Sequence, residues 1–235
     1  MDVDLISFDL DGTLVDTAAE IAEAANLALR FHGIDRRPVA EITDLIGAGT
    51  RELMLKLLAR CFLETPSLAH AVRPEAVLAS FDQHYAATTG TVAQAYPGAR
   101  EALLELKQAG VRLACTTNKE LRYARRVLAA TRLEGLFDLV IGGDSLTHKK
   151  PHRSVLEHVM LTLKSEPDRS AHVGDSAIDI ESARNAGVMA WAVPYGYNGG
   201  RSIEEHDPDL VFQSLLDVAQ HALAVPAVRV ACGAR

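Results

Sequence analysis

Short apolar runs alternate along most of the chain with segments in which apolar residues recur at helical spacing. This alternation predicts an α/β protein with a mostly parallel sheet. Several apolar runs have no alternating polar face, which is typical of strands covered on both sides. Six strands are predicted, at Val3–Phe8, Val111–Thr116, Leu139–Ile141, Ala171–Val173, Met189–Val193 and Leu210–Phe212. Five helices are predicted around them, at Ala99–Gln108, Leu121–Ala130, Val155–Leu163, Ile178–Asn185 and Ser214–Leu223.

The stretch from about Asp16 to Tyr96 interrupts this alternation, because it shows helical periodicity and no convincing strand. Its apolar residues form three stripes that predict the core of a helical bundle. The stripes are Ala18, Ile21, Ala22, Ala25 and Leu29, then Leu53, Met54, Leu57, Leu58 and Cys61, and then Val77, Leu78, Phe81 and Tyr85. We therefore expect residues 16–96 to form an all-helical domain inserted into a core of residues 1–15 and 97–224. Residues 225–235 are expected to fray.

Composition and charge exclude several classes of protein. At 48% hydrophobic and 23% charged residues, the 235-residue chain is typical of a globular protein with a buried core. Its net charge of −7 argues against nucleic-acid binding, and no apolar run has the length of a membrane span. The acidic N-terminus is unlike a signal peptide, and Cys61, Cys115 and Cys232 have no metal-binding spacing. We expect a cytoplasmic monomer or homodimer with no membrane or nucleic-acid partner.

Two carboxylates directly follow the first predicted strand, in the segment Phe8-Asp9-Leu10-Asp11-Gly12. Strand alternation would place Asp9 and Asp11 on the same side of the chain, unless the sharp turn that Gly12 allows reorients Asp11. Open α/β sheets bind their ligands at the carboxyl ends of their strands, where this pair lies. Two carboxylates crowded in this way need either a divalent cation or a proton held by one of them. Either arrangement predicts a chemically active site.

Two further segments place polar groups at the same edge of the predicted sheet. Thr117 and Asn118 end the second core strand beside a predicted helix N-terminus, where side-chain donors and backbone N–H groups can bind phosphate. This signal is weak alone, because Thr and Asn also cap many helices. Lys150 precedes Pro151 at the start of another helix, from which its ammonium can reach the same edge. We expect the neighbouring Lys149 to remain solvated.

A fourth segment adds another pair of carboxylates. Asp175 follows the strand Ala171–Val173, and Asp179 lies four residues later on the first turn of the next predicted helix. Together, Asp9, Asp11 and Asp175 supply the oxygen ligands that Mg²⁺ prefers, with water and a substrate phosphate filling the remaining positions.

In this order, these segments resemble the four motifs of the haloacid dehalogenase superfamily, over residues 3 to about 224. A closer likeness to the phosphoglycolate phosphatase branch rests on segments within and beyond those motifs. They are Leu45-Ile46-Gly47-Ala48-Gly49, Thr117-Asn118-Lys119, Ile141-Gly142-Gly143-Asp144 with Lys149-Lys150-Pro151-His152, and Tyr195-Gly196-Tyr197-Asn198. Two residues depart from the pattern: Arg153 replaces a second proline, and Thr116 replaces an aliphatic residue.

The resemblance implies a Rossmann-like three-layer core with a helical cap inserted after the first motif, and it implies roles for the motif residues. Asp9 would attack phosphorus and become an aspartyl phosphate. Asp11 would protonate the leaving alkoxide and then accept a proton from water. Lys150 would supply fixed positive charge, and Thr117 and Asn118 would hold the phosphoryl oxygens.

The resemblance also implies a metal site and a substrate. Mg²⁺ would be held by Asp9, Asp175 and the Asp11 carbonyl, while Asp179 would orient Lys150 or a metal-bound water. A small phosphorylated metabolite is expected as the substrate, with 2-phosphoglycolate favoured. Another sugar-phosphate phosphatase or a phosphomutase remains an alternative, as does a catalytically silent protein that binds a phosphorylated ligand.

The loop Gly47-Ala48-Gly49-Thr50-Arg51 is a candidate for binding the substrate carboxylate. Gly49 allows close backbone approach, and Arg51 lies on the first turn of the predicted next helix. The alternatives are an ordinary interhelical turn for the loop and a solvated surface residue for Arg51.

Overall fold

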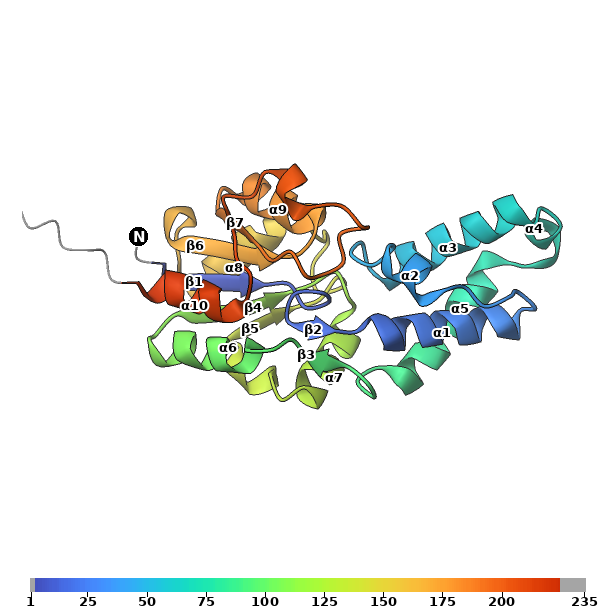
Figure 1. Ribbon diagram of the computed structural model, residues 1–235, viewed down its shortest axis with the longest axis horizontal. Coiled ribbons are helices and arrows are strands. Elements are labelled where there is room, and N and C mark those ends of the chain that lie inside the picture. The colour runs from blue at the N-terminus through green and yellow to red at the C-terminus, as the bar shows by residue number, and fades with distance from the viewer. Residues whose placement is uncertain (1–2, 225–235) are drawn as a thin grey trace, which may run out of the picture.

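The computed structural model describes residues 3–224, so the fraying predicted for residues 225–235 lies outside the described residues. Its centre is a six-stranded sheet with the order β5-β4-β1-β6-β7-β8, in which every neighbouring pair is parallel (Figure 1). The strands are β1 (Leu5–Phe8), β4 (Arg112–Thr116), β5 (Leu139–Ile141), β6 (Ser170–Gly174), β7 (Met189–Ala192) and β8 (Leu210–Val211). All six predicted strands are confirmed.

Helices cover both faces of this sheet and complete three layers (Figure 1). One face carries α6 (Ala99–Gln108), α7 (Leu121–Ala130) and α10 (Leu215–Leu223), and the other carries α8 (Ser154–Leu163) and α9 (Ala177–Ala186). Single 3₁₀ turns occur at Glu134–Leu136, Pro167–Arg169 and Ile203–His206. Side chains along β1 alternate between the two faces of the sheet. Ile6 and Phe8 therefore pack in the cluster with α6, α7 and α10, and Leu5 packs in the cluster with α8 and α9. The expected Rossmann-like α/β fold is confirmed.

Five helices interrupt the core between β2 (Val15–Asp16) and β3 (Gln94–Ala95). They are α1 (Ala18–Phe31), α2 (Val39–Thr43), α3 (Thr50–Glu64), α4 (Leu68–Ala71) and α5 (Pro74–Thr88). The expectation of no strand within this stretch was wrong at its ends, where β2 and β3 pair antiparallel, Val15 opposite Ala95. Two-residue strands have no detectable periodicity, and the partners lie at opposite ends of the insert.

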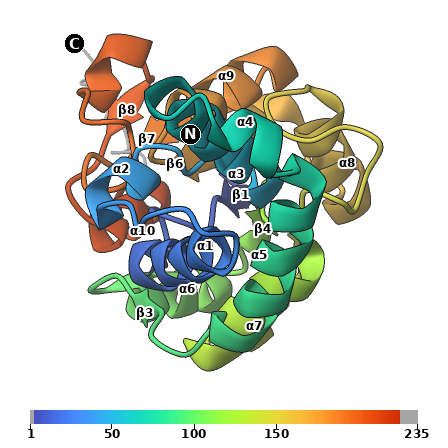
Figure 2. The same cartoon turned by 90° about the vertical axis from the view of Figure 1, so that its right-hand side faces the viewer.

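The inserted helices have a hydrophobic cluster of their own, which contains residues of all three predicted stripes, such as Ile21, Leu57 and Phe81. Tyr123 of α7 joins this cluster from the core. The helices lie beyond the carboxyl ends of the sheet strands (Figures 1 and 2), so they cover the edge where the candidate residues were predicted. Within residues 3–224, no helix is both long and apolar enough to cross a membrane.

Candidate active site

The loop after β1 carries Asp9 and Asp11 to the carboxyl end of the sheet. The backbone N–H of Asp9 donates to the Val173 carbonyl at 2.9 Å, which continues the pairing of β1 with β6. Gly12 then turns the chain at a φ of +90°, a conformation that favours glycine. A Cβ at Gly12 would lie 2.4 Å from an Asp175 side-chain oxygen, so this turn needs glycine for space as well.

Asp9 is only 8% exposed, and it lines a cavity together with Asp11. Burial raises the pKa of Asp9 to about 6, an effect that Lys150 opposes and that the carboxylates of Asp179 and Asp11 reinforce. Lys150 Nζ lies 2.9 Å from Asp9 Oδ1 as an ion pair. Asp9 is therefore a buried carboxylate whose surroundings favour additional positive charge.

Lys150 is held between two carboxylates. Its Nζ lies 2.7 Å from Asp179 Oδ1 as well as 2.9 Å from Asp9 Oδ1, and its side chain is buried. Burial opposes the charge, but the two carboxylates outweigh burial and raise the pKa of Lys150 above its ordinary value. This ammonium is a fixed positive charge beside Asp9, where a phosphoryl group undergoing transfer gathers negative charge.

Both oxygens of Asp179 already accept hydrogen bonds. Oδ1 accepts from Lys150 Nζ and lies 3.2 Å from His172 Nε2, while Oδ2 accepts from the N–H and the hydroxyl of Ser176 at 3.1 and 2.6 Å. The bonds to Ser176 form the capping box of α9. Burial would raise the pKa of Asp179, but Lys150 and His172 lower it below its ordinary value. Asp179 is thus a fixed anion that positions Lys150.

A chain of buried polar groups supports Asp179 from inside the sheet. His172 Nδ1 on β6 lies 3.1 Å from Ser7 Oγ on β1, which lies 2.7 Å from Thr116 Oγ1 on β4. Burial lowers the pKa of His172, so the ring is neutral and one of its nitrogens donates while the other accepts. Thr116, one of the two departures from the superfamily pattern, is the far end of this chain.

Asp175 is also buried, at the end of β6. Its Oδ1 accepts from the Thr13 hydroxyl at 2.6 Å, and its Oδ2 accepts from the backbone N–H of Tyr197 at 2.5 Å. Burial raises the pKa of Asp175 well above its ordinary value, and repulsion from Asp179 and Asp9 adds to this shift.

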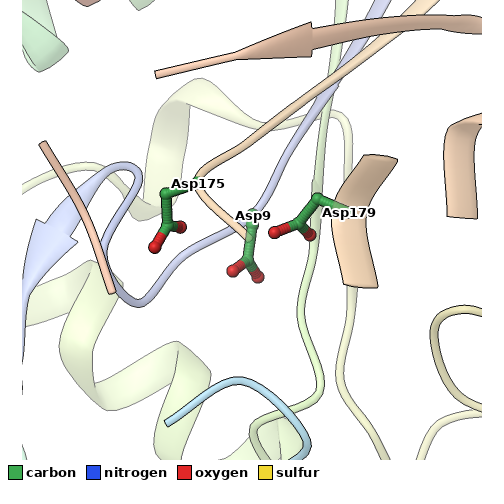
Figure 3. A group of neighbouring side chains, drawn as sticks. All are labelled: Asp9, Asp175 and Asp179. Carbon is green, nitrogen blue, oxygen red and sulfur yellow. The ribbon is translucent and has the colours of Figure 1, made fainter. Parts of the chain in front are cut away.

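The carboxylates of Asp9, Asp175 and Asp179 come close enough to hold a cation. One oxygen from each lies within 4.8 Å of the others, and Figure 3 shows Asp9 between Asp175 and Asp179. Four contacts use the lone pairs of Asp179, whereas Asp175 accepts one hydrogen bond on each oxygen and Asp9 has one ion pair on Oδ1. Asp9 and Asp175 therefore retain lone pairs that a metal would use. Negatively charged oxygen ligands suit Mg²⁺, and a divalent charge would offset the burial and the repulsion that raise the pKa values of Asp9 and Asp175. The residues present therefore fit this ion.

Asp11 pairs with a second buried lysine. Its Oδ1 accepts from Lys119 Nζ at 2.6 Å and from the Thr17 hydroxyl at 2.7 Å. The side chain of Lys119 is 1% exposed and that of Asp11 is 10% exposed. Both bonds end on Oδ1, which leaves Oδ2 for a reacting group.

Thr117 and Asn118 line the same cavity at the end of β4. Thr117 Oγ1 accepts from the Lys119 N–H at 3.2 Å, so its own proton remains available for an anion. The Asn118 amide nitrogen donates to the Gly47 carbonyl at 3.1 Å and to the Lys150 carbonyl at 3.0 Å, and it thereby fastens the inserted helices to the core. The phosphate contacts expected of both residues stay predictions.

The loop before α3 forms the cavity wall on the side of the inserted helices. Gly47, Gly49 and Thr50 line the cavity. Gly49 has a φ of +96°, and a Cβ there would lie 2.9 Å from the Asn118 carbonyl oxygen, so the close approach depends on glycine. Arg51 is exposed on the first turn of α3 and is not among the residues that line the cavity. The structure brings Gly49 to the site and leaves Arg51 outside it.

Comparison with known proteins shows which family combines this fold with this site. Residues 6–193 match the haloacid dehalogenase-like hydrolases. The chain belongs to this hydrolase family. It is 37% identical to the phosphoglycolate phosphatase of Nitrosospira multiformis over 92% of this chain and 93% of that relative. The phosphoglycolate phosphatase of Vibrio vulnificus is 36% identical over 91% of this chain and 93% of its own length.

A solved structure agrees with these relatives. The crystal structure of a predicted phosphoglycolate phosphatase from Haemophilus somnus is similar with a TM-score of 0.85 and 29% identity, over 94% of this chain and 98% of that one. The resemblance stated from the motifs is thereby confirmed.

No sequence pattern in this hydrolase assigns a role to Lys119, Thr13, His172 or Tyr197. Lys119 directly follows Thr117 and Asn118 in a segment that resembles the phosphoglycolate phosphatase branch, but a lysine is solvated by default, so no role follows from its position. Thr13 follows the segment Phe8-Asp9-Leu10-Asp11-Gly12, and His172 lies in the predicted strand Ala171–Val173, yet their contacts with Asp175 and Asp179 depend on how the chain packs. Tyr197 acts through its backbone N–H, which no side-chain pattern reveals.

We expect Asp179→Asn to lower kcat about 10- to 100-fold with little change in KM, the range typical of groups that orient a ligand or a catalytic residue. The amide keeps the shape of the side chain but removes the charge that fixes Lys150. Asp217→Asn is the matched control, because the Ser214 hydroxyl donates to the Asp217 carboxylate at the start of α10 as the Ser176 hydroxyl does to Asp179, and Asp217 lies outside the cavity lining. A kcat equal to that of the control would contradict the positioning role.

Proposed function

We propose that this hydrolase is a Mg²⁺-dependent phosphatase that converts 2-phosphoglycolate to glycolate and phosphate through an aspartyl phosphate on Asp9. The observation that carries the proposal is the shared cavity, in which a buried carboxylate paired with Lys150 faces the same space as Asp11. A nucleophile, a fixed cation and a proton-transfer group converge there, as phosphoryl transfer requires. The relatives named phosphoglycolate phosphatase support this assignment.

Two parts of the chain would share the work. We assign residues 1–15 and 97–224 to a catalytic core and residues 16–96 to a cap that closes over it. Separate hydrophobic clusters in the two parts support this division. The cavity is lined from both, by Asp9 and Thr117 on one side and by Gly49 and Thr50 on the other.

In the first step, an Asp9 carboxylate oxygen forms a bond to phosphorus as the bond from phosphorus to the ester oxygen breaks. Asp11 gives its proton to that oxygen, and glycolate leaves. In the second step, a water gives a proton to Asp11 while its oxygen attacks the aspartyl phosphate, which releases phosphate and restores Asp9. Lys150 stabilises the charge on the phosphoryl oxygens in both steps.

A magnesium ion would be held by the carboxylates of Asp9 and Asp175 and, as the resemblance implies, by the Asp11 carbonyl. When bound, it supplies positive charge that offsets the repulsion between Asp9 and a phosphate dianion. Lys150 remains bound to Asp9 and Asp179 in this arrangement, because both of its ion pairs are already formed within the protein.

The cavity lining favours a short acid over a sugar phosphate. On the side of the cap it consists of Ile21, Ile46, Leu53, two glycines and Thr50. A sugar needs hydrogen-bonding partners for several hydroxyls, and hydroxyls buried against apolar side chains without partners are unfavourable. 2-Phosphoglycolate has no free hydroxyl, so beyond its phosphate it needs partners for a single carboxylate.

The test is phosphate release across 2-phosphoglycolate, sugar phosphates and simple alkyl phosphates, with Mg²⁺ and with a chelator. We expect the highest kcat/KM for 2-phosphoglycolate, a fall of at least about 100-fold after chelation because several kcal/mol of charge stabilisation is lost, and recovery when Mg²⁺ is restored.

A higher kcat/KM for a sugar phosphate would overturn 2-phosphoglycolate as the substrate but would still support a phosphatase. Full activity in the chelator would contradict the metal dependence. Binding of 2-phosphoglycolate without release of phosphate would instead favour a silent ligand-binding protein.

A further inference from the structure

Lys119 is a buried cation that the steps above do not use. It lies between β4 and α7, and with Lys150 it is one of two lysines buried among residues 3–224. Lys150 is bound to two carboxylates, whereas within the described residues Lys119 Nζ donates a hydrogen bond to one acceptor, Asp11 Oδ1. An ammonium carries three donors, so Lys119 has bonding capacity left.

The surroundings of Lys119 keep it charged. Burial opposes its charge, but Asp11 and the nearby Tyr85 raise the pKa of Lys119 above its ordinary value. Its Nζ lies 5.4 Å from the centre of the Tyr85 ring on α5 of the cap. Tyr85 Oη and Glu20 Oε1 are buried without hydrogen-bond partners in the described part of the chain. The region between core and cap therefore contains polar atoms whose hydrogen-bonding capacity is not used, and it adjoins the cavity that Lys119 lines.

We infer that Lys119 binds the carboxylate of the substrate and so determines specificity for phosphorylated short acids. This inference rests on the proposed function. Asp11 faces the ester oxygen in that mechanism, and in 2-phosphoglycolate a single methylene separates this oxygen from the carboxylate carbon. A group that already touches Asp11 at 2.6 Å is therefore next to the position of the carboxylate.

Charge balance supports the same assignment. The cavity edge holds Asp9 and Asp11, so a substrate with a second anion needs a cation beyond Lys150. Arg51 is exposed and outside the lining, whereas Lys119 lies within it. A charge-assisted bond in a water-poor site gives strong discrimination between a carboxylate and a neutral group of the same size.

The test compares Lys119→Met with the wild-type enzyme on two substrates of matched size, 2-phosphoglycolate and 2-hydroxyethyl phosphate. We expect kcat/KM for 2-phosphoglycolate to fall about 10- to 100-fold more than kcat/KM for the neutral substrate, because one hydrogen bond to a charged group is lost. Lys56→Met, at an exposed position on α3, is the matched control and should leave both values unchanged. Circular dichroism and thermal melting confirm that each variant is folded.

A second variant, Lys119→Gln, tests the inference if Lys119→Met does not fold. Lys119→Gln removes the charge but keeps an N–H group that can donate to Asp11, and it should lose the same selectivity. Equal losses on both substrates would show that Lys119 acts only through Asp11 and would overturn the inference, as would no loss on either. A wild-type enzyme that does not prefer 2-phosphoglycolate to 2-hydroxyethyl phosphate would overturn the proposed substrate together with the inference, whereas a preference unchanged in both Lys119 variants overturns the inference alone.

Discussion

Asp9→Asn is expected to abolish turnover, by about 10⁴-fold or more, and to leave the fold intact. An amide fills the volume of the carboxylate but cannot form the covalent bond to phosphorus on which both steps depend. Stability should be unchanged or slightly higher. The pKa of Asp9 is about 6 in the fold against an ordinary 3.8, so the ionised carboxylate is disfavoured by its surroundings above that pH. Lys150 keeps its second partner, Asp179.

Two measurements check this expectation. Steady-state phosphate release gives the loss of turnover, and a rapid acid quench during turnover should trap phosphate on the wild-type protein and not on Asp9→Asn. Asp168→Asn, at an exposed position of the core, controls for the removal of a carboxylate. Folded Asp9→Asn protein with near-normal turnover would refute the nucleophile assignment.

The strand ends explain how much of the site could be predicted from sequence. Asp9 and Asp175 each directly follow a strand that its apolar composition already indicated. Once parallel strands are predicted, their carboxyl ends must lie at one edge, so carboxylates that follow two of them lie at that edge. They come close because β1 and β6 are neighbours in the sheet, which the structure shows. The sequence thus predicts the edge at which Asp9 and Asp175 lie, and the order of the strands determines that the two carboxylates converge.

Lys119 and Arg51 show where this reasoning stops. Both residues are basic and lie close in sequence to segments predicted to bind a ligand. Only packing determines which of the two side chains is buried. The loop before α3 approaches Asn118 so closely that Gly49 has no room for a Cβ, and the helix that follows leaves Arg51 exposed. Lys119 instead lies under the cap, against Asp11 and Tyr85. Such differences arise from contacts between segments that are far apart in the chain.

The sequence left two roles open for Asp179, and its contacts in the structure favour one of them. Its position after Asp175 suited either a role beside Lys150 or one beside a metal-bound water. Four hydrogen-bonding contacts now account for its oxygens, from Lys150, His172 and Ser176. The contact with His172 could not be predicted from the sequence, because a histidine inside a strand is ordinarily a core residue. The contact also depends on how the start of α9 folds back over β6.

Asp11→Asn is expected to lower kcat/KM for 2-phosphoglycolate about 10²- to 10⁴-fold, the usual contribution of general acid catalysis. An amide cannot give a proton to the departing oxygen, although it can still accept the bonds from Lys119 and Thr17 that fix its position. Because those bonds are retained, we expect Asp11→Asn to fold normally. Its melting temperature, compared with that of the Asp168→Asn control, tests this.

The leaving group separates the acid role of Asp11 from its other contributions. Glycolate leaves as a basic alkoxide unless it is protonated, whereas p-nitrophenolate is stable without a proton. Since kcat/KM reports steps only through the first irreversible one, the later removal of a proton from water does not enter the comparison. Asp11→Asn should therefore lose at least about 10-fold more kcat/KM on 2-phosphoglycolate than on p-nitrophenyl phosphate. Equal losses would mean that Asp11 acts through charge or position, by way of Lys119, rather than as the acid.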